Sequence, residues 1–140
     1  MDMLYTALCE PVRLALGDFG LTARYGEVPG SYCDGRFNLN VQGLKVTGTA
    51  LRIAFAPENP RGVQSGVMAQ AMIMIEADAG ALTEVVNTFY REAGGERQFD
   101  PAVSAAVADF LPAEAPGVRT KQFREALWAQ FHRLAGSGDS

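Results

Sequence analysis

A lysine flanked by amides and hydroxyls is the part of this sequence best equipped for chemistry. On either side of it, polar and apolar residues alternate with the period of a β-strand. An ammonium group among neutral hydrogen-bonding groups can hold an anion or polarise a carbonyl oxygen. The competing interpretation is an ordinary solvated face of an antiparallel sheet. If the two strands form one hairpin, a single face carries Arg36, Asn38, Asn40, Lys45, Thr47 and Thr49.

Cys33 is the second candidate for chemistry. It stands in the glycine-rich segment Gly26–Gly35, which predicts a loop. A loop cysteine can be exposed and act as a nucleophile, and Lys45 could assist it if the loop folds back onto the hairpin. The alternative is an inert thiol. Cys9 and Cys33 could pair, but without a secretory signal we expect both to be free thiols.

The sequence predicts both the turn and the register of the hairpin that positions Lys45. Phe37, Leu39 and Val41 alternate with polar residues, and Gln42-Gly43 fits a two-residue turn in which glycine supplies a positive φ. A register slip by one residue would exchange the two faces. This turn predicts four cross-strand pairs: Val41 with Leu44, Asn40 with Lys45, Leu39 with Val46, and Asn38 with Thr47.

Helices and further strands surround this hairpin in the predicted order. Apolar spacing from Leu4 to Phe19 predicts a first helix, in which Pro11 marks a kink or the start of a second helix. A short strand over Leu21–Tyr25 follows. Ala56–Gly66 is predicted as a loop. The run Val67–Glu76 is nearly all apolar and predicts a strand buried on both faces, with a buried helix as the competitor.

The C-terminal half is predicted to be helical. Asp78 is placed to cap a helix that Gly94-Gly95 would end, and Asp100-Pro101 is typical of a helix start. That second helix should end before Pro112, and Thr120 can cap a last helix. The apolar stripes of the first and last of these helices are Leu82, Val85, Val86, Phe89, Tyr90 and Ala93, and Phe123, Leu127, Phe131 and Leu134.

These elements predict an α+β fold in one domain covering residues 1–140, with residues 137–140 as a flexible tail. A small antiparallel or mixed sheet with a central hairpin would pack against helices. The chain has 140 residues, a net charge of −4 and 48% hydrophobic residues, which is ordinary globular composition. The absence of a basic patch, a membrane-length apolar run and a signal peptide predicts a cytoplasmic protein without nucleic-acid or membrane partners. No Cys/His spacing predicts a metal site.

The stretch Gly30–Arg52 resembles the signature of the catalytic domain shared by lipoate–protein ligase A, octanoyltransferases and biotin ligases. In that family an acidic or amide residue and an aliphatic residue begin a short strand, and a turn leads into G-x-K-[IV]-x-G-[ST]-A. The corresponding positions here are Asn38-Leu39, Gly43, Lys45, Val46, Gly48, Thr49 and Ala50. The resemblance implies part of a class II synthetase-like biotin/lipoate ligase domain.

The resemblance also implies roles for individual residues. Lys45 would lie against the acyl carbonyl and stabilise developing negative charge, and Cys33 lies near the position of a thioester-forming cysteine in one octanoyltransferase branch. Lipoate or octanoate would be the acyl group, and a lipoyl carrier domain or acyl carrier protein the partner. The acyl group would pass to a lysine of a carrier domain, in protein lipoylation. The substrate-binding residues would be Arg36, Asn38, Thr47, Gly48, Thr49 and Ala50.

Three features depart from the family pattern. The ligase branch has Asn-Asp where adenylate and magnesium are handled, whereas this chain has Phe37-Asn38, which argues against ATP and magnesium. The family's His-Gly is replaced by Gln70-Ala71. The arginine- and glycine-rich N-terminal half of the domain has no counterpart, so we expect the chain to be the C-terminal portion of the domain. An exposed sheet edge would then require self-association or a partner chain.

Three functions remain open on this evidence. The chain could be a ligase or transferase, a non-catalytic or truncated module that binds a lipoyl group or carrier domain and needs a partner chain, or a plain α+β interaction domain.

Overall fold

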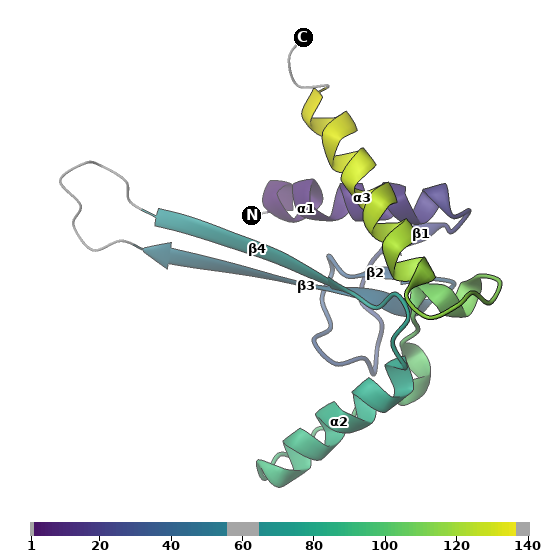
Figure 1. Ribbon diagram of the computed structural model, residues 1–140. Coiled ribbons are helices and arrows are strands. Elements are labelled where there is room, and N and C mark those ends of the chain that lie inside the picture. The colour runs from purple at the N-terminus through teal and green to yellow at the C-terminus, as the bar shows by residue number, and fades with distance from the viewer. Residues whose placement is uncertain (1, 56–64, 137–140) are drawn as a thin grey trace.

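A computed structural model describes residues 2–55 and 65–136 of the chain (Figure 1). It confirms the α+β class, with helices on both sides of one antiparallel sheet. The predicted loop Ala56–Gly66 lies mostly outside the described residues, as does the predicted tail 137–140. The elements are α1 (Asp2–Asp18), β1 (Ala23–Tyr25), β2 (Leu39–Val41), β3 (Leu44–Phe55), β4 (Ser65–Ile73), α2 (Ala79–Glu92), the 3₁₀ turns η1 (Pro101–Val103) and η2 (Val107–Phe110), and α3 (Val118–Gly136).

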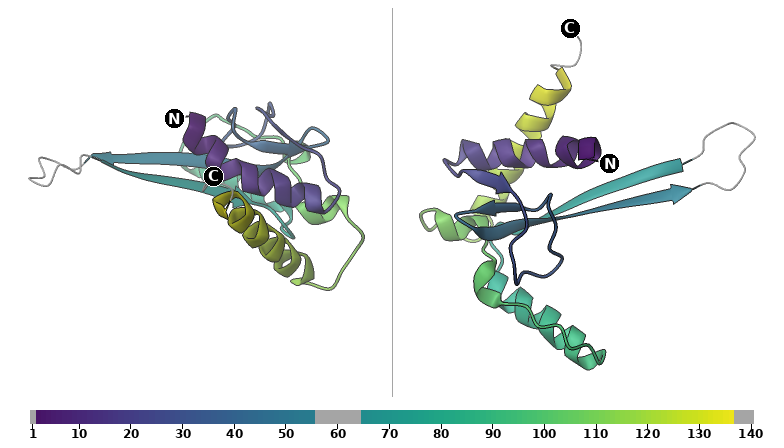
Figure 2. Two further views of the ribbon diagram at one scale, coloured as in Figure 1. Left: turned by 90° about the horizontal axis from the view of Figure 1, so that it is seen from above. Right: turned by 180° about the vertical axis from the view of Figure 1, so that it is seen from behind.

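The sheet follows chain order, β1-β2-β3-β4, and every neighbouring pair is antiparallel. β3 and β4 pair without interruption from Thr47 opposite Ile73 to Phe55 opposite Ser65. These two strands extend well beyond β1 and β2 and project away from the rest of the molecule (Figures 1 and 2). The base of this long hairpin, next to β2, is therefore where sheet, loops and helices meet.

The predicted hairpin turn between β2 and β3 is confirmed. Gln42 and Gly43 have φ values of 52° and 82°, so both central residues are left-handed, as a type I′ turn requires. The first two predicted pairs are also present, Val41 with Leu44 and Asn40 with Lys45. The turn thus fixes the register at the closed end of the hairpin.

The register predicted beyond those two pairs is wrong, because the ladder shifts by one residue between Leu39 and Asn40. Leu39 lies opposite Thr47 rather than Val46, which makes Val46 the extra residue of a β-bulge. Residues directly opposite each other share a face. Thr47 therefore follows Leu39 to the core side of the sheet, and both are completely buried.

The core lies between the sheet and the helices α1 and α3, which occupy the same side of the sheet in Figures 1 and 2. Phe123 of α3 is 1% exposed and stacks on Phe19 at a centroid distance of 5.9 Å. Pro11 lies inside one continuous α1, so it does not start a second helix. The buried members of this core are Cys9, Val12, Ala15, Leu16, Leu21, Ala23, Leu39, Val41, Val46, Val107 and Phe123.

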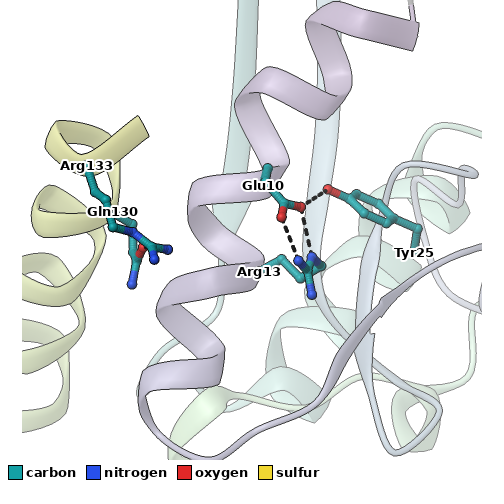
Figure 3. Close-up of polar contacts among 5 residues, drawn as sticks. All are labelled: Glu10, Arg13, Tyr25, Gln130 and Arg133. Atoms are coloured by element: carbon teal, nitrogen blue, oxygen red, sulfur yellow. Dashed lines mark hydrogen bonds and ion pairs between the residues drawn. The ribbon is translucent and has the colours of Figure 1, made fainter. Parts of the chain in front are cut away.

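A polar network ties α1 to β1 (Figure 3). Arg13 donates two hydrogen bonds to the Glu10 carboxylate, and the Tyr25 hydroxyl donates to the same group at 3.3 Å. The hydrogen bond from Arg13 is the main cause that lowers the pKa of Glu10. Burial, with the nearby Glu10 charge, raises the pKa of Tyr25 to about 12. Gln130 and Arg133 of α3 lie across from this network in Figure 3.

Burial corrects two sequence predictions. β4 is not buried on both faces, because the β3–β4 hairpin projects away from the helices, and Met68 and Met72 are 55% and 53% exposed (Figure 1). The predicted apolar stripe of α2 is also exposed to solvent, and Phe89 is 68% exposed. The reason is that α2 extends from the side of the sheet opposite α1 and α3 (Figure 1). The buried residues of α2 are Ala79, Thr83 and Asn87.

The helix boundaries are predicted with mixed success. Asp78 caps α2 by accepting a hydrogen bond from the Ala81 N–H, and Gly94 follows the helix with a φ of 76°. Asp100 caps only a 3₁₀ turn, so the predicted helix before Pro112 is wrong; η1 and η2 are separated by an extended link. Among the described helices, none is long and apolar enough to cross a membrane.

The core position of Phe123 generates a stability prediction. Phe123→Ala should lower the free energy of unfolding by about 3–5 kcal/mol, because the ring is fully enclosed between α1 and α3. Trp128→Ala on the same helix is the matched control; its ring is 67% exposed, so about 1 kcal/mol or less is expected. Urea unfolding monitored by circular dichroism gives both values. Equal losses in the two variants would contradict this description of the core.

Candidate functional site

A cavity of about 450 Å³ opens at the base of the β3–β4 hairpin. One wall comes from the loop before β2, which carries Tyr32 and Cys33, and another from the paired strands. Gly48, Thr49 and Ala50 of β3 lie opposite Met72, Ala71 and Gln70 of β4. Lys45 is the charged group of this lining. The lining residues are Tyr32, Cys33, Lys45, Gly48, Thr49, Ala50, Gln70, Ala71 and Met72.

Lys45 is buried, with 1% of its surface exposed, and its ammonium group is held by main-chain oxygens. Nζ donates to the carbonyls of Tyr32 and Cys33, the latter at 3.0 Å, and lies 4.9 Å from the centre of the Tyr32 ring. No carboxylate forms an ion pair with it in the described part of the chain. An ammonium has three N–H donors, so two are used on the loop and one remains for an oxygen in the cavity.

Burial lowers the pKa of Lys45, because water no longer solvates the charged form. Charges on Cys33 and Asp34 act in the opposite direction and favour the ammonium. Cys33 and Lys45 line the same cavity, and Nζ of Lys45 lies 3.0 Å from the Cys33 carbonyl oxygen.

Cys33 stands on the loop as an exposed free thiol, in contrast to Cys9, which is free and buried. Its φ of 49° places it in the left-handed region, which is unusual for a residue with a Cβ. Asp34 turns the loop locally by accepting hydrogen bonds from the N–H groups of Val28 and Gly35. The loop folds back onto the hairpin and brings Cys33 and Lys45 to the same cavity.

The bulge at Val46 brings Lys45 over the surface of β3 that lines the cavity. A Cβ added to Gly48 would lie 3.5 Å from Cε of Lys45 and 3.7 Å from Nζ, so the lysine side chain passes directly over this glycine. In a regular strand, residues three apart would point to opposite faces. The bulge therefore places the lysine side chain on the same side as Gly48, while Thr47 turns to the core.

Three residues predicted to bind substrate are absent from the cavity lining. Thr47 is turned to the core by the bulge. Arg36 is drawn away by an ion pair with Asp2 of α1 at 2.5 Å and by the ring of Phe37, 4.8 Å from its guanidinium carbon. Asn38 uses both ends of its amide on main-chain groups. The remaining predicted residues, Gly48, Thr49 and Ala50, do line the cavity.

Some residues of the site were not singled out in the sequence. Tyr32 supplies both a carbonyl and a ring to Lys45, and its position beside Cys33 was the only available signal. The link between η1 and η2 supports Lys45 from behind, because the N–H of Ala105 donates to the carbonyl of Lys45 at 2.9 Å and Ser104 forms a parallel bridge with it. No local pattern in the sequence marks this long-range contact.

Comparison with known proteins gives a consistent set of relatives. The octanoyl-[GcvH]:protein N-octanoyltransferase of Kyrpidia tusciae is 32% identical over 111 residues, which are 76% of this chain and 38% of that protein. The enzyme of the same name from an Exiguobacterium species is 32% identical over 133 residues, 89% of this chain and 44% of its own length. No protein-family profile matches the chain.

Solved structures share the fold. A lipoate-protein ligase A bound with ATP matches 97% of this chain and 47% of its own, with a TM-score of 0.64 and 17% identity. A T. acidophilum protein with bound lipoic acid matches 96% of this chain and 46% of its own, with a TM-score of 0.58 and 19% identity. The chain resembles the octanoyltransferase and lipoate–protein ligase family, as the hairpin motif indicated. It spans less than half the length of these relatives.

The burial of Lys45 generates a pH prediction. The folded chain releases the Lys45 proton below the ordinary pKa of 10.5, so between the lowered value and 10.5 the unfolded chain binds more protons. The contribution of Lys45 to stability should therefore rise as pH rises through that window and be smallest below it. Urea unfolding of the wild type and Lys45→Met, from neutral pH to about pH 10.5, measures this difference. The exposed Lys121→Met is the control for loss of one lysine, and a difference for Lys45→Met that falls with pH would contradict the prediction.

Proposed function

We propose that this chain carries out acyl transfer in protein lipoylation, moving an octanoyl or lipoyl group to a lysine of a carrier domain. The observation that supports the proposal best is the pairing of an exposed thiol, Cys33, with a buried ammonium, Lys45, on the wall of one cavity. In acyl transfer a nucleophile attacks the acyl carbon, and a fixed positive charge stabilises the negative charge that develops on the oxygen.

The proposed first step uses both groups together. The Cys33 thiol attacks the acyl carbonyl, and the free N–H of Lys45 donates to the oxygen as it becomes negative. The new carbon–sulfur bond forms as the bond between the acyl carbon and the donor breaks, and the thiol proton leaves with the donor group. In the second step the neutral amine of a carrier lysine attacks the thioester. The amide carbon–nitrogen bond forms as the carbon–sulfur bond breaks, and the proton lost by the amine returns to the Cys33 sulfur.

The walls of the cavity favour a medium-length apolar acyl chain. Ala50, Ala71 and Met72 present apolar surface next to Lys45, while Gly48 leaves room beside the reacting carbon. The names of the octanoyltransferase relatives and the lipoic acid bound to the T. acidophilum neighbour support octanoate or lipoate as the acyl group. Phe37-Asn38 at the start of the strand favours transfer from an acylated donor over ligation with ATP and magnesium. We propose a cytoplasmic protein that meets a lipoyl carrier domain or an acyl carrier protein there.

A second candidate is a non-catalytic module that holds a lipoyl group or carrier domain and needs a partner chain. It is favoured by Gln70-Ala71, which lines the cavity and stands where the family has His-Gly. We infer that the chain corresponds to the C-terminal portion of the family domain. Turnover of a carrier substrate separates the two candidates, because a binding module would bind the acylated carrier without forming a covalent adduct.

Mass spectrometry of the intact chain tests the catalytic proposal. After incubation with an octanoylated carrier protein, the wild type should gain one octanoyl group and Cys33→Ala none. Lys45→Met should form the adduct at least about a hundredfold more slowly, because the oxygen loses its donor. Lys121→Met, which removes the other lysine of the chain, should behave as the wild type. An adduct that persists in Cys33→Ala would remove Cys33 from the mechanism, and an unchanged rate in Lys45→Met would refute the role of Lys45.

We also propose that a second copy of this chain covers the edge of β4. Residues 65–73 contain no charge and no proline, and such an edge strand offers unpaired main-chain groups for pairing. Two β4 strands running antiparallel would present the same residues to each other. The exposed Val67 and Met68 add apolar surface next to that edge.

Light scattering coupled to size exclusion tests this arrangement. The wild type should have the mass of a dimer, and Met68→Lys should shift it to the monomer, because two like charges would face each other across the new strand pair. Met3→Lys on α1, at a side chain that is 80% exposed, is the matched control and should stay dimeric. A monomeric wild type at micromolar concentration would contradict the proposal.

A further inference from the structure

Asn38 occupies the junction between the Cys33 loop and the sheet. It is buried, with 1% of its surface exposed, and it is not among the residues that line the Lys45 cavity. Its main chain is also engaged, because its N–H donates to the Gly35 carbonyl and its own carbonyl accepts from the N–H of Gly26. An amide that is buried in this way and absent from the lining is not presented to a substrate in the cavity.

The side chain of Asn38 connects two segments that carry the site. Its Nδ2 donates to the carbonyl of Cys33 at 3.0 Å, and its Oδ1 accepts from the N–H of Thr49 at 3.1 Å. The sheet register explains the second contact. β2 begins at Leu39, opposite Thr47, so the amide of Asn38 takes the place of the next rung of the β2–β3 ladder.

The carbonyl of Cys33 is the point at which Asn38 and Lys45 meet. Nδ2 of Asn38 and Nζ of Lys45 each lie 3.0 Å from this oxygen. Two donors on one carbonyl hold the Cys33 peptide in its left-handed conformation, which a residue with a Cβ disfavours. The Cys33 main chain and one of the two carbonyl contacts of the ammonium therefore depend on one shared oxygen.

We infer that Asn38 is a positioning residue for acyl transfer, which fixes the Cys33 thiol and the free N–H of Lys45 relative to each other. The inference rests on the proposed function. Without Asn38, the Cys33 carbonyl keeps Lys45 as its only side-chain donor, and the loop can move together with the ammonium. A reaction that needs thiol and ammonium at the same carbonyl suffers from that movement, whereas a reaction that needs the thiol alone does not.

Two reactions of Cys33 separate positioning from general loosening. In the first, the thiol attacks S-octanoyl-N-acetylcysteamine; the octanoyl carbon–sulfur bond of the donor breaks, and N-acetylcysteamine leaves as the thiol with the proton. In the second, the thiol attacks the uncharged disulfide 2,2′-dithiodipyridine; the sulfur–sulfur bond of the reagent breaks, a mixed disulfide forms, and pyridine-2-thione leaves with the proton. This reagent has no carbonyl for Lys45 to polarise. Cys9 is 0% exposed, so the native chain offers Cys33 to both reagents.

The measured quantity is the ratio of the acylation rate to the disulfide-exchange rate. Intact mass gives the acylation rate, and absorbance of the released thione gives the exchange rate. Asn38→Leu keeps the branched shape of the side chain and removes both hydrogen bonds; it should lower the ratio about tenfold or more. Gln130→Leu is the control for loss of a buried amide, because Gln130 on α3 donates to Asp18 and accepts from Arg133 outside the cavity lining, and its ratio should be that of the wild type. Asn38→Ser, too short to reach both partners, should also lower the ratio and serves if Asn38→Leu does not fold.

The outcomes distinguish the inference from the proposed function. A wild type that exchanges with the disulfide but is never acylated would refute the proposed function and the inference with it. A wild type that is acylated, with an unchanged ratio in the folded Asn38 variants, would overturn the inference alone. Equal changes in both rates would do the same, because they would show that Asn38 only stiffens the loop.

Discussion

A buried ammonium group needs hydrogen-bond acceptors, and in this chain main-chain carbonyl oxygens provide them. Lys45 is 1% exposed and donates to the carbonyls of Tyr32 and Cys33. Because an unpaired buried charge is very unfavourable, the loop must turn these two carbonyls inward. That requirement places Cys33 in the left-handed region and at the mouth of the cavity. The same interaction that stabilises the lysine therefore brings the thiol to it.

The sheet is adapted to this interaction by a single extra residue. The bulge at Val46 places Lys45 over Gly48 and sends Thr47 to the core. Bulges commonly re-aim side chains next to functional sites. Because β2 is short, the main-chain hydrogen bonding between β2 and β3 stops at Leu39. The side chain of Asn38 accepts a hydrogen bond from the Thr49 N–H beyond this point and donates one to the Cys33 carbonyl of the loop. Loop, bulge and amide thus form one unit around the lysine.

The sequence predicts the local parts of this unit better than the long-range ones. Gln42-Gly43 marks the turn because few residues accept its φ values, and Asp78 and Gly94 mark a helix for equally local reasons. The alternation of residues 44–49 does not reveal the bulge, so the predicted register fails after its second pair, Asn40 with Lys45, and Thr47 does not share the face of Lys45. The motif led to Lys45, Cys33, Gly48, Thr49 and Ala50, which all line the cavity.

The failures have a shared physical origin in contacts between distant segments. Apolar periodicity in α2 and β4 predicts burial, but it cannot say whether a neighbouring element is present to cover the residues; Phe89 and Met68 are exposed. Arg36 is drawn to Asp2, 34 positions earlier in the chain, and no spacing rule anticipates that pair. Likewise Ala105 reaches Lys45 from the C-terminal half. These contacts follow from the tertiary fold.

The central claim is that the Lys45 ammonium donates to an acyl oxygen carried by Cys33. The chain has two lysines, Lys45 and Lys121, so selective ¹⁵N labelling of lysine gives two side-chain signals that mutation assigns. The most direct measurement records them by NMR before and after octanoylation of Cys33. The account predicts that the Lys45 signal shifts and exchanges more slowly with water, because a new acceptor has entered the cavity, while the Lys121 signal stays unchanged. A Lys45 signal that does not respond to the thioester would contradict the account.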